Sequence, residues 1–193
     1  SIVRILITGG AGCLGSNLVE RFIPAGHEVH VIDNFETSKR AVLPKVAGLT
    51  IQPGSIADEN VVVSAFNNFR PTHVIHAAAA YKDPENWAED NATNCLGVIN
   101  VARAAQEHQV KKIVNLQTAL VYGRPVEVPI PVTHATNPLT SYGISKLCGE
   151  NYLSMIASEI SVSTLRLANV TGPRLCIGPI PTFYSRLKEG KAC

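Results

Sequence analysis

The 193-residue sequence lacks several features that mark whole classes of protein. Only 17% of its residues are charged, the formal net charge is +2, and there is no run of lysines or arginines, which argues against nucleic-acid and membrane-surface partners. No stretch is long and apolar enough to span a bilayer or to resemble a signal peptide, so we expect a cytoplasmic protein. Repeats and low-complexity tracts are also missing, and the composition is that of a globular protein.

Cysteine and histidine are present, but without the spacing of a disulfide framework or a metal site. The number of cysteines, five, is odd, and the sequence contains no C-x-x-C pair. Both observations favour reduced thiols in a cytoplasm. Two pairs of histidines each flank apolar strand residues. Residues three apart on a strand point to opposite faces, so we expect packed histidines and no metal. These pairs are His27 with His30 and His73 with His76.

A glycine-dense turn near the N-terminus carries the strongest signal. Gly10, Gly12 and Gly15 fit G-x-G-x-x-G, and with Gly9 the looser G-x-x-G-x-x-G also fits. Glycines allow a close approach of the backbone to a ligand, and the start of the following helix attracts phosphate. Either match alone also fits a tight turn without a ligand. Asp33, which ends the next predicted strand, accepts ribose hydroxyls and repels a 2′-phosphate, so it favours NAD over NADP.

Strand patterns alternate with helical patterns along the chain. We predict strands at 2–8, 28–33, 49–52, 73–78, 111–117 and 161–168, and helices at 14–25, 58–69, 84–108 with a break near Asn91, 139–158 and 182–189. The alternation implies parallel pairing with right-handed crossovers, and the near-continuous apolar strands indicate a sheet covered on both faces. We therefore predict an α/β doubly wound Rossmann sheet of order 3-2-1-4-5-6, with ligands at the carboxyl ends of its strands.

Residues at and after the fifth predicted strand carry candidate catalytic chemistry. Tyr142 and Lys146 are four apart on a predicted helix and share one face, where an ammonium lowers the pKa of a phenol. Thr118 ends the strand, so its hydroxyl can bond a sugar oxygen in the cleft; the alternative is a threonine that only satisfies a turn. Tyr184 and Lys188 have the same spacing after the sixth strand, and we interpret that pair as chance.

Taken in order, these motifs resemble the extended short-chain dehydrogenase/reductases. More narrowly, they resemble the NAD-dependent sugar-nucleotide epimerase/dehydratase family of bacterial O-antigen and surface-polysaccharide pathways. The resemblance covers essentially the whole chain. It rests on the glycine turn, Asp33-Asn34, His76-Ala77-Ala78, Thr118 before Val121-Tyr122-Gly123, Tyr142 with Lys146, and Leu165-Arg166-Leu167-Ala168-Asn169-Val170-Thr171-Gly172-Pro173.

The resemblance implies two domains and a set of catalytic residues. It implies an NAD-binding Rossmann domain at 1–170 and the start of a small substrate-binding region at 171–193, which family members continue past the end of this chain. It implies a homodimer through the helices at 92–108 and 140–158. The implied catalytic residues are Thr118, Tyr142 and Lys146, and the implied substrate contacts are Tyr81, Thr118 and Asn169.

The cofactor contacts are also implied by the resemblance. Asn94 matches a family asparagine that steadies the fifth strand and the cofactor site. Lys39 and Arg40, near Asp33, either soften the preference for NAD or are solvated surface charges. The full set of implied contacts is Gly9, Gly12, Cys13, Leu14, Gly15, Asp33, Asn34, Ser38, Ser55, Ile56, Ala77, Ala78, Ala79, Asn94, Tyr142 and Lys146.

Two departures from the family pattern refine this expectation. The family's 4,6-dehydratases carry an Asp-Glu pair directly after the catalytic threonine, where this chain has Ala119 and Leu120. Neither side chain can move a proton, which argues against dehydration. Ser55 stands where family members often carry an aspartate that contacts the adenine, so that contact is weaker here unless Asp58 stands close.

We therefore expect an NAD-dependent epimerase that acts at C4 of a UDP-hexose or UDP-uronic acid. As a phenolate, Tyr142 would take the proton of the sugar hydroxyl while hydride passes to tightly bound NAD, and the hydride would return to the other face of the keto-sugar. The alternatives are a net reductase, dehydrogenase or dehydratase on the same fold, and a non-catalytic dinucleotide-binding protein.

Overall fold

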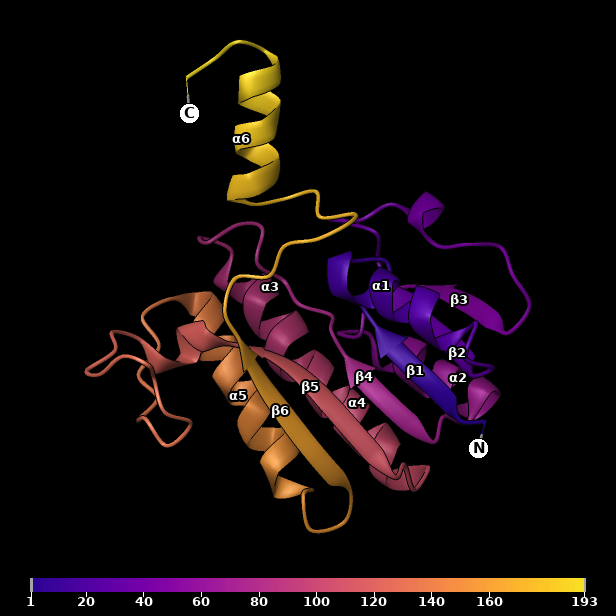
Figure 1. The fold of residues 1–193 in the computed structure, drawn as a ribbon. Coiled ribbons are helices and arrows are strands. Elements are labelled where there is room, and N and C mark those ends of the chain that lie inside the picture. Colours follow the sequence, from indigo (N-terminus) through magenta and orange to yellow (C-terminus); the bar gives the residue numbers. More distant parts are fainter. Residues whose placement is uncertain (1, 193) are drawn as a thin grey trace.

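The computed structural model describes residues 2–192, so Ser1 and Cys193 lie outside the described residues. Six parallel strands form one sheet in the order β3-β2-β1-β4-β5-β6, which confirms the predicted doubly wound order (Figure 1). The strands are β1 (Arg4–Thr8), β2 (Glu28–Asp33), β3 (Leu49–Pro53), β4 (His73–His76), β5 (Lys112–Thr118) and β6 (Ser161–Leu167).

Helices cover both faces of the sheet, as the crossovers require. Helix α1 (Cys13–Phe22) packs on one face, whereas α2 (Glu59–Phe69), α4 (Gly97–Glu107) and α5 (Ser141–Met155) pack on the other (Figure 1). Helix α6 (Pro179–Lys188) projects away from the sheet. Short helical segments are η1 (Arg40–Val42), α3 (Trp87–Asn91), η2 (Ala92–Leu96) and η3 (Ala119–Tyr122). None of the helices within residues 2–192 combines the length and the apolar character needed to cross a membrane.

The sheet separates two hydrophobic cores. Successive strand residues point to opposite faces, so Leu6 belongs to the core under α2, α4 and α5, and Ile7 belongs to the core under α1. Phe66 of α2 is completely buried in the first of these cores, together with Val74 and Ile113 from the central strands. The two cores hold the strands rigidly, and thereby fix the positions of the residues at their carboxyl ends.

Strand β4 ends two residues earlier than the sequence predicts, because the side chain of Thr8 captures the next backbone groups. The Thr8 Oγ1 atom accepts hydrogen bonds of 3.2 Å from the backbone N–H groups of Ala77 and of Ala78. Gly9 follows with a φ of +68°, and a Cβ atom there would lie 2.7 Å from the Ala78 nitrogen. Glycine is therefore required where the ends of β1 and β4 meet.

The long helical region begins at Trp87 and breaks close to the predicted position, Asn91. The break is the π-helix η2, and Asn94 lies in it. The Asn94 side chain accepts a 2.8 Å bond from the N–H of Ala80 and donates bonds to the Ala80 carbonyl (2.8 Å) and the Ser145 hydroxyl (3.1 Å). The π-helix thus places the Asn94 amide between the loop after β4 and helix α5. Single π-helical turns inside α-helices are frequent at functional sites.

Strand β6 differs from the expectation that both faces of every strand are covered. Its residues are only partly buried, and Ser161 and Leu165 are exposed. Helix α5 lies against one face of β6, and no helix of the described chain covers the other face (Figure 1). The reason is that α6, which follows β6, projects away from the sheet instead of packing on it.

Replacement of Phe66 by alanine should lower the free energy of unfolding by about 3–5 kcal/mol, because it empties a fully buried site in the larger core. Urea denaturation of the full-length protein measures this change. Val63→Ala on the same helix, where the side chain is 39% exposed, should cost less than about 1 kcal/mol. Equal losses for the two variants would contradict the assignment of this core.

Candidate active site

A cavity of about 780 Å³ lies at the carboxyl ends of the strands, where doubly wound sheets bind their ligands. Every site residue that the sequence predicts lines this cavity except Asn94. The predicted residues that line it are Gly9, Gly12, Cys13, Leu14, Gly15, Asp33, Asn34, Ser38, Ser55, Ile56, Ala77, Ala78, Ala79, Tyr81, Thr118, Tyr142, Lys146 and Asn169.

The glycine turn brings the start of α1 to the cavity. Gly12 is the N-cap of α1, and no side chain of the described residues caps this helix end. A Cβ atom on Gly15 would lie 2.5 Å from the Gly9 carbonyl oxygen, so the turn can close only without one. No acidic residue lies in the first turn of the helix. The free N–H groups and the positive end of the helix dipole therefore fit an anionic group such as a pyrophosphate.

Asp33 is held in place at the edge of the cavity. Its Oδ2 atom accepts a 2.9 Å hydrogen bond from the N–H of Ala11, and its Oδ1 atom accepts bonds from the N–H of Phe35 (2.8 Å) and the hydroxyl of Ser38 (3.1 Å). These three donors orient the carboxylate without using all of its lone pairs. Ser38 thus lines the cavity and also positions Asp33. The remaining lone pairs of Asp33 can accept hydrogen bonds from the hydroxyl groups of a ribose.

The structure also decides alternatives near Asp33 that the sequence left open. Lys39 and Arg40 are exposed and do not line the cavity, so their positions fit solvated surface charges. Asp58 caps helix α2 by accepting a 2.9 Å bond from the N–H of Asn60, and it does not line the cavity either. Ser55 alone faces the cavity at this position, with its hydroxyl bonded to the N–H of Ala57.

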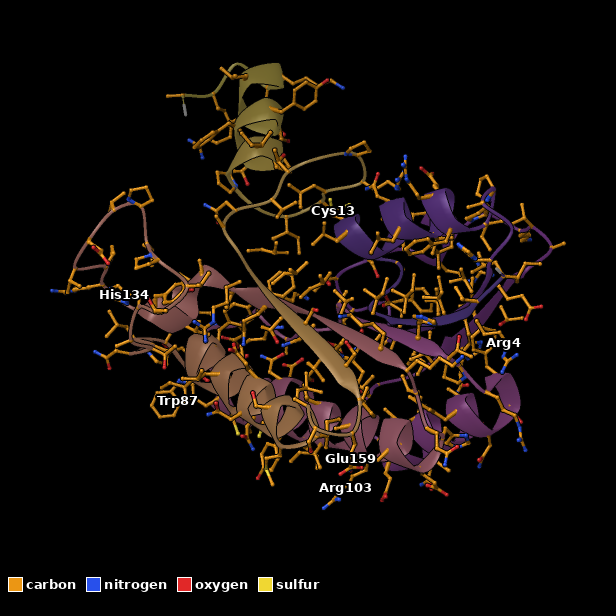
Figure 2. The ribbon with its side chains drawn as sticks, turned by 60° about the horizontal axis from the view of Figure 1, so that its bottom comes forward. Arg4, Cys13, Trp87, Arg103, His134 and Glu159 are labelled. Carbon is orange, nitrogen blue, oxygen red and sulfur yellow. The ribbon has the colours of Figure 1, made fainter. Side chains whose placement is uncertain are left out.

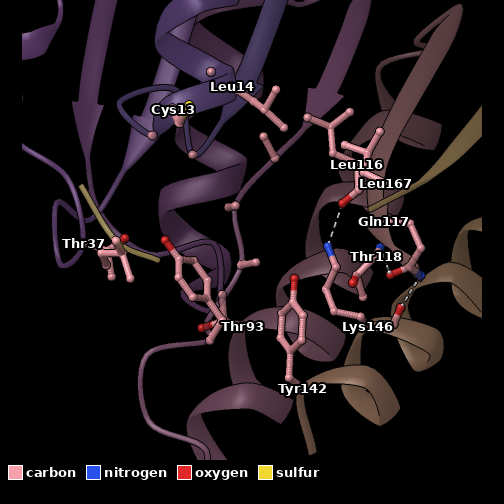
Figure 3. A pocket seen from close by; sticks show the side chains of 18 of the residues that line it. Cys13, Leu14, Thr37, Thr93, Leu116, Gln117, Thr118, Tyr142, Lys146 and Leu167 are labelled. Carbon is pink, nitrogen blue, oxygen red and sulfur yellow. Dashed lines mark hydrogen bonds between the residues drawn. The ribbon is translucent and has the colours of Figure 1, made fainter. Parts of the chain in front are cut away.

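Tyr142, Lys146 and Thr118 lie together on the opposite side of the cavity from Cys13 and Leu14 (Figure 3). Tyr142 and Lys146 are one helical turn apart in α5. The Lys146 Nζ atom donates a 2.8 Å hydrogen bond to the carbonyl of Leu116, the dashed line in Figure 3. The three candidate catalytic residues therefore share one wall of the site, on rigid elements.

The pKa values of this pair differ from the sequence-based expectation. Burial raises the pKa of Tyr142 to about 12, and the charges of Tyr81 and Asp90 add to the increase. Burial lowers the pKa of Lys146 to about 8, although the charge of Glu150 opposes that change. The expected lowering of the Tyr142 pKa is therefore wrong for the structure as it stands, because desolvation of the phenolate is the largest effect on it.

Thr118 combines two roles that the sequence presented as alternatives. Its Oγ1 atom accepts a 3.2 Å bond from the N–H of Leu120 and so caps the short helix η3. The same side chain lines the cavity. Because the oxygen is the acceptor in this cap, the hydroxyl proton is left for donation to a ligand oxygen.

A polar network behind Lys146 was missed by the sequence reasoning. Glu150 accepts a 2.6 Å bond from Gln117 and pairs at 2.6 Å with Arg166. Gln117 also donates 3.0 Å to the carbonyl of Lys146 and accepts 3.0 Å from the N–H of Thr118. The network joins β5, α5 and β6 directly behind the catalytic wall. The only hint in the sequence is that Glu150 lies one turn after Lys146.

Asn94 and the second Tyr/Lys pair lie outside the cavity. Asn94 is completely buried behind the cavity wall and bonds Ala80, so it positions the wall rather than forming it. Its neighbour Thr93 lines the cavity instead. Tyr184 and Lys188 lie on α6 and do not line the cavity, in agreement with their interpretation as a chance pair.

Two side chains from the region before η2 complete the catalytic side of the cavity. The ring of Tyr81 meets the ring of Tyr142 edge-on, with 6.3 Å between centroids. Asp90 lines the cavity while being only 2% exposed, and its Oδ2 atom has no hydrogen-bond partner among residues 2–192. Sequence reasoning gave no role to Asp90, because nothing local marks it as facing α5.

Comparison with known sequences finds a matching family and similar proteins. Residues 5–193 match the model of the NAD dependent epimerase/dehydratase family. The UDP-glucose 4-epimerase of Streptococcus mutans is 36% identical over 182 residues, which are 89% of this chain and 53% of that protein.

Solved structures give the same result. The Bordetella bronchiseptica enzyme WbmG in complex with NAD is 63% identical with a TM-score of 0.94, over 100% of this chain and 62% of that one. WbmG has also been solved with NAD and UDP. The UDP-glucose 4-epimerase of Thermotoga maritima, solved with UDP-glucose, is 34% identical with a TM-score of 0.90, over 97% of this chain and 64% of that one. The chain thus spans between half and two thirds of these relatives.

Replacement of Glu150 by glutamine should lower the pKa of Lys146 further below about 8, because it removes the charge that opposes the effect of burial. The partner cation Arg166 would then repel the ammonium without compensation. An NMR titration of the lysine ¹³Cε shift measures the change. Glu159→Gln, which alters an exposed acceptor of Gln106, is the matched control and should leave the pKa unchanged. An unchanged or higher pKa in the Glu150 variant would show that this carboxylate does not act on Lys146.

Proposed function

The chain belongs to the NAD dependent epimerase/dehydratase family, and we propose that it is the cofactor-binding part of an NAD-dependent nucleotide-sugar epimerase. The substrate we propose is a UDP-hexose or UDP-uronic acid, epimerised at C4. One observation carries the proposal: Thr118, Tyr142 and Lys146 line the same cavity as the glycine turn and Asp33. The NAD and UDP found in WbmG, and the UDP-glucose found in the Thermotoga maritima enzyme, support a ligand of this class.

The residues of the cavity fit NAD. The uncapped start of α1, with Gly12 and Gly15 around it, suits the pyrophosphate, and Asp33 suits the adenosine ribose. When bound, NAD supplies a reversible hydride acceptor for the sugar carbon.

The catalytic side chains then handle the proton and the sugar oxygen. The Thr118 hydroxyl donates a hydrogen bond to the reacting sugar oxygen. Tyr142 takes the proton of the sugar hydroxyl and later returns it. The phenolate of Tyr142 needs a compensating charge, because burial and the charges of Tyr81 and Asp90 raise the pKa of Tyr142 to about 12. The ammonium of Lys146, with a pKa of about 8, is present at neutral pH and is lost as the pH rises above 8.

Ala119 and Leu120 favour epimerisation over dehydration. Both line the cavity directly after Thr118, at the positions where the related dehydratases carry an acid pair. Neither side chain can donate or accept a proton, so the wall has no group there to eliminate water. The sugar oxygen is therefore served by Thr118 and Tyr142 alone on this wall.

We propose a homodimer through the helical regions 92–108 and 140–158. One stripe of α5 carries Ile144, Tyr152 and Met155, all exposed, and Leu96 is exposed on η2. A stripe of large apolar side chains at helical spacing fits a helix-to-helix interface with a second copy. We further propose that residues 1–170 form the cofactor domain and that residues 171–193 begin the substrate region. We also propose that the enzyme acts in the cytoplasm, where it makes nucleotide-sugar precursors of surface polysaccharides.

Ile144→Glu should convert the full-length dimer to a monomer, because it places a charge on the apolar stripe of α5. Sedimentation equilibrium measures the mass in solution. Val132→Glu, in an exposed loop away from the two helical regions, should leave the dimer intact. A Ile144→Glu protein that stays dimeric would place the interface elsewhere.

Tyr142→Phe should reduce turnover about 1,000-fold while NAD stays bound, because the phenyl ring keeps the packing and loses the proton-transfer group. The full-length protein is assayed by NMR on UDP-hexoses and UDP-uronic acids, and the retained NAD is measured after gel filtration. Tyr184→Phe, in the other pair of the same spacing, is the matched control and should turn over normally. Undiminished turnover of the Tyr142 variant would exclude this mechanism, and net consumption of NADH would indicate a reductase.

A further inference from the structure

After β6 the chain returns to helix α1 and crosses beside its N-terminus (Figure 1). We name residues 173–177 the crossing segment. The carbonyl of Pro173 accepts hydrogen bonds from the Asn17 side chain (3.2 Å) and from the Cys13 thiol (3.5 Å). Figure 2 shows Cys13 at this junction between α1 and the C-terminal part of the chain. The segment is therefore attached to the same helix turn that borders the cavity.

Arg174 provides the strongest part of this attachment. Its Nε atom donates a 2.9 Å bond to the Ser16 hydroxyl, and its terminal nitrogens contact the Glu20 carboxylate at 3.0 Å. Arg174 has a φ of +66°, a left-handed conformation that costs energy in a residue with a side chain. Such a conformation persists where surrounding contacts enforce it, which indicates a specifically built contact rather than a chance one.

The crossing segment also forms part of the cavity wall. Leu175 and Ile177 line the cavity together with Gly12 and Leu14 of the glycine turn. Pyrophosphate binding is proposed at this turn, so the segment borders the position of the phosphates. Gly178 directly follows the segment with a φ of +115°, and a Cβ atom there would have no neighbour within 4 Å. An unpacked glycine at the end of a bordering segment is suited to act as a hinge.

We propose that the crossing segment controls the release of bound NAD, and that Arg174 is the positioning residue that fastens it to α1. The proposal rests on the proposed function only in that NAD occupies this cavity. NAD leaves after the contacts of Arg174 with Ser16 and Glu20 open. A cofactor that is regenerated in every catalytic cycle has to stay bound between cycles, and this attachment provides the retention.

The ion pair gives the proposal a specific signature. The Glu20 side chain is 52% exposed and that of Arg174 is 22% exposed, so salt screens their attraction. Release of the cofactor from the wild-type protein should therefore become faster as the salt concentration rises. In an Arg174→Ala protein the release rate should depend much less on salt. A residue that only supported the fold would not produce this difference.

The experiment measures the release of NADH from the full-length protein. Loaded protein is mixed with excess NAD, and the fluorescence of bound NADH is followed at low and high salt. Arg174→Ala should release NADH about ten-fold faster at low salt, because a charge-assisted hydrogen bond and an ion pair are lost. Glu20→Gln should also accelerate release, and adding it to Arg174→Ala should have little further effect. Arg21→Ala removes an exposed cation from the same helix and should release at the wild-type rate.

The outcomes separate the two proposals. If the wild-type protein binds no NADH, the proposed cofactor is wrong. If NADH binds, but the Arg174→Ala and Glu20→Gln proteins release it no faster than Arg21→Ala, the role of the crossing segment is overturned. Glu20 lies on the packed helix α1, so its variant tests the contact even if Arg174→Ala does not fold. A uniform loss of thermal stability without a change in release rate would likewise contradict the proposal.

Discussion

The site depends on one backbone contact, the close approach of the ends of β1 and β4. Gly9 reaches the Ala78 nitrogen because it carries no Cβ atom, and the Thr8 hydroxyl accepts hydrogen bonds from the N–H groups of Ala77 and Ala78 directly after β4. This contact ends both strands at the same level and turns the chain into α1. From there a chain of bonds runs through Ala80 and Asn94 to Ser145 of helix α5. The glycine turn and helix α5, which carries Tyr142 and Lys146, are therefore positioned from a common origin.

In the cavity wall that carries Tyr142 and Lys146, burial and a nearby carboxylate act on side-chain pKa values in opposite directions. Burial makes the charged forms of Tyr142 and Lys146 costly, since it raises one pKa and lowers the other. The Glu150 carboxylate counteracts the change at Lys146, and Arg166 balances the charge of Glu150 on the side away from the cavity. With a pKa of about 8, Lys146 thus stays mostly cationic at neutral pH although burial lowers that pKa. Glu150, which does not line the cavity, thus affects the charge of Lys146, which does.

The sequence predicts those features that depend on local pattern. Strand order, the glycine turn, Asp33 and the Tyr142–Lys146 spacing follow from periodicity and short motifs, and the structure brings all of these residues to one cavity. Features that depend on which elements meet were not predictable. The Glu150 network joins three elements, and the high pKa of Tyr142 comes from burial that no spacing encodes. The open face of β6 depends on where α6 goes, which local helical pattern does not say.

The π-helix η2 has a consequence for what this chain can tolerate. It lies between α3, whose Asp90 lines the cavity, and α4, whose Val101 and Ala105 belong to the core with α2. A π-helical turn holds more residues than an α-helical one, because its hydrogen bonds span five residues instead of four. Deletion of one residue from Ala92–Leu96 would let this wide turn close into a regular α-helix, and it would withdraw Asn94 from Ala80. In this stretch the number of residues therefore matters as much as the identity of the one that binds Ala80, because a deletion and a substitution of Asn94 break the same contacts.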